Sequence, residues 1–541
     1  MNLSDHDLSQ IDEPYVRSLS PGQQLDLLMK ILSDLKKSRD RLNQTPENSS
    51  VPSGSLPPWA SGTVNPKSDP EEDDAEEETA IKEIEKALKN SEDTGDAGSN
   101  ADNNASQASS QQKGKRGDKE TKRNPGKQPG AQGHGRKLEL ALTGPDENHR
   151  ASDCAGCGRE LGEDAPFHAS TGLYVVDLLM LAGFLGLKLT HIKHLYGDTE
   201  CVCGHMTRTE PGRSETEPEW KVALTEWHLV GPMLASFIVC LAFRMRLSRA
   251  RIQEFLNDWL GLWLGIGTIN KCIHEAGRAA APLEDQMVEE IQHSGLLHGD
   301  ETPWKEWGKK LWLWAFSTAT VALFVVGDRS SKVIEKVLGQ DYSGWLMSDG
   351  WKVYRTFLKR LRCWAHLIRK ARGLSESLDG TARKFGERAL AVMEKLQDDV
   401  YKAREGPPGD AKLMRRHAIR LGKFKAFCMR HWFSEHEKTR ALAREFINDW
   451  EAIWAVLSCP HLPLTNNEVE RLLRHWVIAR RISHGTRSPQ GTRAFALLAS
   501  VIETCRKRDI SPWPYLARVI ANRRKGEAAP PLPTMAVEFG W

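Results

Sequence analysis

The chain has 541 residues, which is enough for several domains and a large hydrophobic core. Its net charge is only +3, but residues 1–110 contain 10 basic and 22 acidic residues, a net of −12, so the remainder carries +15. The polar, acidic N-terminus predicts no secretory signal peptide, and the apolar run at 173–189 is too short and too interrupted by charge for a membrane span. The basic body favours a polyanionic partner.

The first 137 residues read as one helix followed by a long polar segment. Within residues 1–44, leucines at 25, 28, 32 and 35 predict an amphipathic or coiled-coil helix. Residues 45–137 are rich in Ser, Asn, Pro and acids, including an acidic run at 69–78, which predicts a disordered linker. Its basic, Gly- and Pro-rich end, 113–137, is a candidate DNA-binding arm with Lys127 and His134 as contacts; a solvated linker is the alternative.

Four of the ten cysteines form two close pairs within residues 138–215. Cys154 and Cys157 make a C-x-x-C pair, and Cys201 and Cys203 make a C-x-C pair. Because tetrahedral Zn²⁺ takes four soft ligands from two short turns, this region is predicted to be a zinc-binding domain with a structural ion. The tight second pair leaves the fourth ligand open between Cys203 and His205.

Residues 216–292 show helical periodicity. The stretch at 246–277 predicts a helix, a glycine-bearing turn and a second helix that begins near Thr268. The helix lengths and the position of the turn are typical of a helix-turn-helix, and the region is therefore a candidate DNA-binding domain. An ordinary helical hairpin is the alternative, because its sequence pattern is similar.

Residues 293–374 contain strand signals with acids at the strand ends. Asp300 follows a short apolar run, residues 310–330 predict two strands joined near 317–320, and a further short strand ends at Asp349. Apolar residues occupy both faces of these strands, so the sheet is expected to be covered on both sides. A strand, a hairpin, a helix and a strand in this order predict a ribonuclease-H-like α/β core. An Asp-Gly turn is the alternative role for Asp349, and a cap or turn for Asp300.

A helix is predicted over residues 464–481, with Thr465 and the asparagines at 466 and 467 as its N-terminal caps. At roughly 100° per residue, Glu468 and Glu470 point about 200° apart, so one active site could use only one of them. Glu470 shares its face with both asparagines and with Arg474. The expected buried face is formed by Val469, Leu472, Leu473 and Trp476.

Asp300, Asp349 and Glu470 together make a set of three carboxylates. Two Mg²⁺ ions, or Mn²⁺ in their place, need hard oxygen ligands from separate elements that converge on one point. The spacing is 49 residues between the aspartates but 121 from Asp349 to Glu470. The long second interval predicts a helical insertion at 375–460, in which the apolar residues Phe385, Ala389, Val392, Leu396 and Val400 repeat at helical spacing.

In their order along the chain these pieces resemble the DDE transposases of the insertion-sequence-66 family, which are encoded by bacterial mobile elements. The matching segments are NPGKQPGAQGH at 124–134, the two cysteine pairs, DET at 300–302, SDGWKVY at 348–354, RCWAH at 362–366 and TNNEVERLLR at 465–474. The family's N-N-x-x-E-R frame selects Glu470 over Glu468, in agreement with the helix-face argument. The acidic segment at 45–112 is longer than the family pattern leads us to expect.

The resemblance implies a multidomain α/β protein with a zinc-binding domain, a helical DNA-binding region and a ribonuclease-H-like core. Residues 461–541 complete that core with the helix of the catalytic Glu470. The implied activity is metal-dependent cleavage at terminal inverted repeats and joining of the 3′-OH to target DNA. Expected partners are DNA, a second copy of the chain and accessory proteins of the same element, in the nucleoid-associated bacterial cytoplasm.

Three arginines of the predicted Glu470 helix are candidate phosphate contacts, with ordinary surface charge as the alternative: Arg474, Arg480 and Arg481. Two other functions fit the same residues. One is a catalytically silent DNA-binding protein derived from a transposase, and the other is a ribonuclease-H-like nuclease without strand-transfer activity. The three acids argue against the first, and a joining assay separates the second.

Overall fold

The computed structural model describes residue 11 and residues 13–42, 141–181, 186–214, 219–339, 341–405 and 412–534. The linker and basic arm expected at 45–137, with Lys127 and His134, lie outside these residues. None of the described helices combines the length and apolar character needed to cross a membrane.

The N-terminal segment forms two helices, α2 (Glu13–Ser18) and α3 (Pro21–Leu42). The helix predicted from the leucine spacing is therefore present. Its leucines at 25, 28, 32 and 35 are all exposed, so this apolar stripe contributes nothing to the core of the described chain.

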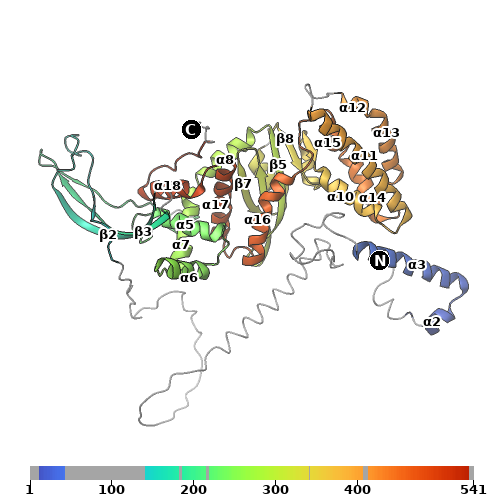
Figure 1. Cartoon of the computed structure of the whole chain (residues 1–541), viewed down its shortest axis with the longest axis horizontal. Coiled ribbons are helices and arrows are strands. Elements are labelled where there is room, and N and C mark those ends of the chain that lie inside the picture. The colour runs from blue at the N-terminus through green and yellow to red at the C-terminus, as the bar shows by residue number, and fades with distance from the viewer. Residues whose placement is uncertain are drawn as a thin grey trace, which may run out of the picture. The chain divides into compact units, whose positions relative to one another are not determined.

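The region of the cysteine pairs is built from strands. The long strands β2 (Phe167–Leu181) and β3 (Gly186–Glu200) form an antiparallel hairpin, which accounts for the apolar run at 173–189. The short strands β1 (Glu147–His149) and β4 (Met206–Arg208) pair with β3 on its other edge, β1 parallel and β4 antiparallel. Both long strands are labelled in Figure 1.

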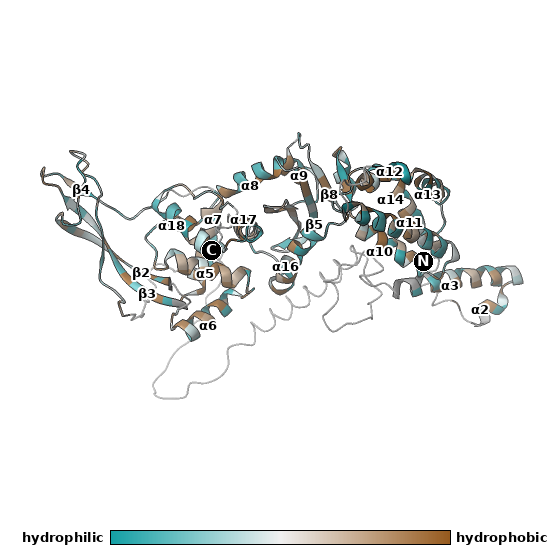
Figure 2. Ribbon diagram, turned by 45° about the horizontal axis from the view of Figure 1, so that its top comes forward, coloured by the Kyte–Doolittle hydropathy of each residue, from teal (hydrophilic) through white to brown (hydrophobic). Residues whose placement is uncertain are grey.

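Helices follow the hairpin as predicted: α5 (Pro232–Phe243), α6 (Arg249–Leu260), α7 (Ile266–Ala280) and α8 (Leu283–Gln292). The turn between α6 and α7 begins at Gly261, whose φ of 61° is favourable for glycine. Helices α5 and α7 pack with the C-terminal helices α17 (Pro489–Lys507) and α18 (Pro512–Lys525). Hydrophobic residues cover much of α5 in Figure 2, as its burial within this group requires.

The central sheet has five strands: β5 (Leu296–Glu306), β6 (Lys309–Ser317), β7 (Ala322–Gly327), β8 (Trp345–Ser348) and β9 (Arg360–Arg362). Their order is β7-β6-β5-β8-β9, with β7, β6 and β5 antiparallel and β5, β8 and β9 parallel. Helix α9 (Ser331–Leu338) connects β7 to β8, and α16 (Asn467–Ser483) packs on β5 and β6 (Figure 1). The consecutive β6 residues 313–317 are all buried, as expected for a sheet covered on both faces.

Helix α17 closes the outer edge of this sheet. Ser500 Oγ accepts a hydrogen bond from the backbone N–H of Phe324 at 2.8 Å, and Thr504 Oγ1 accepts one from the N–H of Ala322 at 3.1 Å. The Thr504 hydroxyl also donates to the carbonyl of Ala322 at 3.1 Å. Side chains one helical turn apart thus satisfy backbone groups that an edge strand would otherwise leave unpaired.

The insertion between the second and third acids is helical, as predicted. It contains α10 (Trp364–Ser375), α11 (Gly380–Glu405), α12 (Leu413–Arg416), α13 (Ala418–Arg430), α14 (Glu437–Asn448) and α15 (Trp450–Trp454), gathered in one group in Figure 1. These helices share a hydrophobic core of their own, to which all five residues of the predicted α11 repeat belong. The remaining short helices are η1 (Lys352–Thr356) and η2 (Ala455–Leu457).

A cluster of buried ion pairs attaches the insertion to the sheet. The carboxylate of Asp449, at the end of α14, is 1% exposed and lies 3.0 Å from Arg355 and 3.3 Å from both Arg360 and Arg362. Arg362 also contacts Glu445 of α14. Because these arginines come from η1 and β9, the cluster links the sheet edge to α14 and α15.

We predict that Asp449→Asn lowers the free energy of unfolding by about 3–5 kcal/mol, because it leaves buried guanidinium groups without a full counter-charge. Urea denaturation followed by circular dichroism measures the loss. The control is Glu254→Gln, which removes an exposed partner of Arg251 and should cost less than about 1 kcal/mol. Equal effects of the two substitutions would contradict a structural role for the cluster.

Candidate active site and cysteine cluster

The strand register places Asp300 beside Asp349. Strands β5 and β8 pair in parallel with His298 opposite Met347, so continuing the register by two residues brings Asp300 opposite Asp349. Residues in register on neighbouring strands point to the same face of a sheet. Asp300 was expected at a strand end, but β5 continues to Glu306 because its other edge remains paired with β6.

Asp349 begins a tight turn after β8. Its Oδ1 accepts a hydrogen bond from the backbone N–H of Trp351 at 2.9 Å, so the turn role considered from the sequence is present. Gly350 leaves room for the ion pair beside it, since a Cβ there would lie 2.6 Å from the guanidinium of Arg362 and 2.8 Å from the carboxylate of Glu445. One oxygen of Asp349 thus organises the turn while the carboxylate stays near Asp300.

Asn466 fixes the start of α16. Its Nδ2 donates to the carbonyl of Gly299 at 2.9 Å, and its Oδ1 accepts from His298 Nδ1 at 3.0 Å. Its backbone N–H donates to Cys363 Sγ at 3.2 Å. Asn466 is the N-cap residue of α16, within the predicted cap, but its side chain makes no capping hydrogen bond because it is buried and bonded to β5.

Glu470, one turn into α16, faces the start of α10. Its Oε1 lies 3.2 Å from His366 Nε2, and its Oε2 lies 4.0 Å from Arg369. The hydrogen bond from His366 and the positive charges of Arg369 and Arg474 outweigh burial and lower the pKa of Glu470. Glu470 is therefore ionised at neutral pH.

Glu468 points elsewhere, as the helix geometry predicts. It accepts hydrogen bonds from Ser317 Oγ at 2.9 Å and from Lys507, and His298 Nε2 lies 3.7 Å away. On the buried side of the helix, Val469, Leu473 and Trp476 are buried as expected, whereas Leu472 is only partly buried.

The electrostatics link Asp300 to the other two acids. Burial, and next to it the negative charges of Asp349, Glu301 and Glu470, raise the pKa of Asp300 well above its usual range. Carboxylates that repel one another in this way are stabilised when a cation lies between them. The oxygen-only donor set of Asp300, Asp349 and Glu470 fits the hard divalent ions Mg²⁺ and Mn²⁺.

Glu301 was not identified from the sequence, although it lies inside the DET segment. Its side chain is 1% exposed, is paired with Arg329 at 3.0 Å and accepts from the Tyr354 hydroxyl at 2.9 Å. Burial and the charge of Asp349 raise the pKa of Glu301 to about 7. Tyr354 belongs to the SDGWKVY segment, so the two segments are in contact, but single-sequence spacing gives no sign of that bond.

The three predicted phosphate contacts on α16 differ in their surroundings. Arg474 and Arg481 are exposed, and Arg474 is near enough to act on the charge of Glu470. The guanidinium of Arg480 is partly buried and donates to the carbonyl of Pro303 and to Thr302 Oγ1. Arg480 therefore holds α16 against β5.

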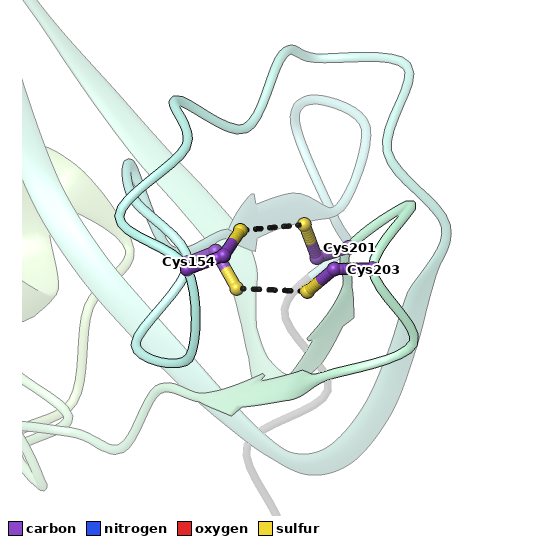
Figure 3. Close-up of side chains that lie close together, drawn as sticks. Cys154, Cys201 and Cys203 are labelled. Atoms are coloured by element: carbon purple, nitrogen blue, oxygen red, sulfur yellow. Dashed lines mark hydrogen bonds between the residues drawn. The ribbon is translucent and has the colours of Figure 1, made fainter.

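The four cysteines converge at the end of the β2–β3 hairpin. Cys154 Sγ lies 3.6 Å from Cys203 Sγ, and Cys157 Sγ lies 3.7 Å from Cys201 Sγ (Figure 3). All four sulfur atoms lie within 4.8 Å of one another. A tetrahedral Zn²⁺ with bonds of about 2.3 Å requires sulfur atoms about 3.8 Å apart, so the cluster fits the ion. Hydrogen bonds from backbone N–H groups, first that of Cys157, lower the pKa of Cys154 to about 6, which favours the ligating thiolate.

The geometry favours Cys203 over His205 as the fourth ligand. Cys203 Sγ belongs to the four-sulfur group, whereas the ring of His205 lies against Gly156, where a Cβ would be 2.7 Å from the imidazole. Gly156 thus makes room for His205 beside the cluster.

Comparison with known proteins gives a family match over the part of the chain that contains the three acids. Residues 228–494 match the model described as Transposase IS66 family. These residues are an IS66-family transposase domain. The resemblance seen in the sequence is confirmed for these residues. The matched range includes Asp300, Asp349 and Glu470.

Similar curated proteins are uncharacterized proteins of Sinorhizobium fredii. The protein y4qI is 24% identical over 280 residues, covering 45% of this chain and 50% of y4qI. The protein y4jO is 30% identical over 160 residues, covering 28% and 46%. The protein y4jD is 22% identical over 409 residues, covering 69% and 74%. The chain thus spans about half the length of the first two relatives.

We predict that Asp300→Asn raises the melting temperature of the metal-free transposase domain. A carboxyl with a raised pKa keeps a proton that the unfolded chain releases, so stability falls as pH rises through that range. The rise in melting temperature should therefore be larger at pH 8 than at pH 5. Each kcal/mol of repulsion removed should raise the melting temperature by roughly 2–4 °C. Differential scanning fluorimetry in chelator measures it, and the exposed Asp341→Asn is the control. A lower melting temperature for Asp300→Asn at every pH would contradict repulsion among the acids.

For the cysteine cluster, we predict that replacing Cys154 and Cys157 together by serine removes one zinc ion per chain. Because thiolate ligation is coupled to folding, residues 141–214 should then become sensitive to protease. Elemental analysis and limited proteolysis provide the measurements. Cys459→Ser, which lies outside the cluster, should change neither. A protein purified without zinc would rule the prediction out.

Proposed function

We propose that this chain is a DNA transposase that cuts at the terminal inverted repeats of its element and joins the liberated 3′-OH to target DNA. The observation that carries the proposal is that the charges of Asp349, from the turn after β8, and Glu470, from α16, both act on the buried Asp300 of β5. Their sheet, with a strand, a hairpin, a helix and a further parallel strand, supports a ribonuclease-H-like core.

The three carboxylates would hold two divalent ions, which when bound activate the attacking oxygen and stabilise charge on the phosphate. The chain positions the ligands in advance: the β5–β8 register sets the two aspartates, and Asn466 sets the helix of Glu470. His366 keeps Glu470 ionised, and Glu301, bound by Arg329 and Tyr354, adds a negative charge that acts on Asp300.

The reaction needs no covalent protein–DNA intermediate. In cleavage, a water oxygen forms a bond to phosphorus as the bond from phosphorus to the 3′ oxygen breaks, leaving a 3′-OH and a 5′ phosphate. In joining, that 3′-OH attacks a phosphodiester of the target, and the target's own 3′ oxygen leaves. Each step exchanges one phosphorus–oxygen bond for another, which suits a site whose role is positioning and charge stabilisation.

DNA would be held by cations around the acids. Arg474 and Arg481 are exposed on α16, the helix that carries Glu470. The segment at 411–427, which forms α12 and most of α13, is basic, and the buried cluster at Asp449 anchors its neighbours to the sheet. Phosphate contacts of this kind fix the register of DNA without reading its sequence.

We further propose that the protein works in the nucleoid-associated bacterial cytoplasm, as a homo-oligomer that can involve accessory proteins of its element. Two element ends must be processed together, and the exposed leucines of α3 offer an apolar stripe for self-association. The presence of all three acids argues against a silent DNA-binding protein. A nuclease without joining activity would use the same acids, and a joining assay separates it from a transposase.

We predict that Glu470→Gln abolishes cleavage and joining while DNA affinity remains nearly unchanged. Loss of a direct metal ligand should cost more than the roughly 10–100-fold typical of losing a ligand's neighbour. Labelled DNA carrying the inverted repeats, incubated with Mg²⁺ and a target plasmid, reports both steps on one gel. The matched control is Glu468→Gln, whose position faces Ser317 and Lys507. Full activity of Glu470→Gln with loss in Glu468→Gln would reverse the assignment, and cleavage without joined product in the wild type would identify a nuclease.

A further inference from the structure

Strand β1 has little to hold it in place. It is three residues long and pairs in parallel with β3, from Glu147 opposite His194 to His149 opposite Tyr196. A parallel pair this short is weak, and the surrounding region has a small core. Among its described residues, 141–181 and 186–214, the buried apolar side chains are Val176, Leu178 and Tyr196 with two of the cysteines.

Three potential metal ligands face one another across this strand pair. Glu147 and His149 are two residues apart on β1, and His194 lies opposite Glu147 on β3, so all three point to one face. His149 Nε2 lies 2.9 Å from His194 Nδ1, which lies 3.4 Å from Glu147 Oε2. The three ligand atoms all lie within 4.8 Å of one another.

The surroundings hold the ring of His149 in place. The ring stacks on Tyr196, with centroids 4.3 Å apart and planes 2° apart, and the backbone carbonyl of His149 accepts a hydrogen bond from Thr209 Oγ1 at 2.6 Å. These contacts leave His149 Nε2 directed at His194 Nδ1.

We propose that Glu147, His149 and His194 form a second metal site, separate from the cysteines, that takes Zn²⁺ or a similar transition-metal ion. Two imidazole nitrogens and a carboxylate oxygen suit zinc, and bonds of about 2.0–2.1 Å place tetrahedral ligands about 3.3 Å apart. The distances of 2.9 and 3.4 Å lie close to that value. With three protein ligands, the site leaves a fourth position for water.

The order of ligands along the chain supports this assignment. His149 precedes Cys154 by five residues, and His194 precedes Cys201 by seven. Each segment that carries a cysteine pair therefore also carries one histidine of the proposed site, a few residues before the cysteines. Two ions would clamp the same two segments at successive points, replacing the hydrophobic core that this region lacks. The competing arrangement is a hydrogen-bonded histidine pair that binds no metal.

Zinc content of the full-length protein tests the proposal. After dialysis against micromolar zinc, elemental analysis should find two ions per chain, falling to one in His149→Asn and in His194→Asn. The matched control is His168→Asn, an exposed histidine on β2, which should keep both ions. Replacing Cys154 and Cys157 by serine should remove the other ion. One ion per wild-type chain, lost only with the cysteines, would overturn the proposal, as would two ions in both histidine variants.

Cobalt substitution shows whether a variant remains folded. The cysteine site gives a sulfur-to-cobalt charge-transfer band, whereas a site of nitrogen and oxygen ligands gives only weak visible bands. His149→Asn should keep the former and lose the latter. If His149→Asn also loses the thiolate band, the Glu147→Gln variant is used as the test instead, because the exposed Glu147 can be substituted without disturbing the fold. That variant should keep the thiolate band and lower the affinity for the second ion at least roughly tenfold. Unchanged affinity in Glu147→Gln would overturn the site. None of these measurements depends on DNA cleavage.

Discussion

The hydrogen bonds of Asn466 are the constraint on which the candidate active site depends. One amide joins the carbonyl before Asp300 to the start of the helix that carries Glu470, and the same residue's N–H reaches Cys363 at the start of α10. Sheet, helix and insertion therefore meet at one buried side chain. Such a side chain holds its position because a broken hydrogen bond there would leave a buried polar group without a partner. Acids 121 residues apart in sequence can then form one site.

The acids themselves are placed at an energetic cost that the rest of the fold offsets. Burial and like charges raise the pKa of Asp300, and the repulsion is held in place by the β5–β8 register and by the ion pairs at Asp449. Cations bound between the acids would relieve this repulsion. The ion pairs at Asp449 join the insertion to the sheet, beside its proposed contact with DNA.

Local periodicity was enough to predict much of this architecture. The α11 repeat, the hairpin near Ser317 and the division of Glu468 from Glu470 all follow from spacing within one element, which the chain itself determines. What depends on tertiary contacts could not be read in this way. Asn466 is of a residue type that is common at helix N-caps, but its side chain bonds to β5 instead of to its own helix. Asp300 lies within a strand because β6 extends beside it, and the pairing of His149 with His194 requires a register that no spacing reveals.

The closure of the β7 edge by Ser500 and Thr504 has a consequence for synthesis of the chain. The ribosome delivers the five strands before α17, so until residue 504 has emerged the hydrophobic edge strand exposes unpaired backbone groups. A product truncated between Glu470 and α17 would retain both aspartates and Glu470. Its unpaired β7 edge could then pair with strands of other nascent chains. Versions of this protein that lack α17 would therefore be more prone to aggregate than the chain that includes it.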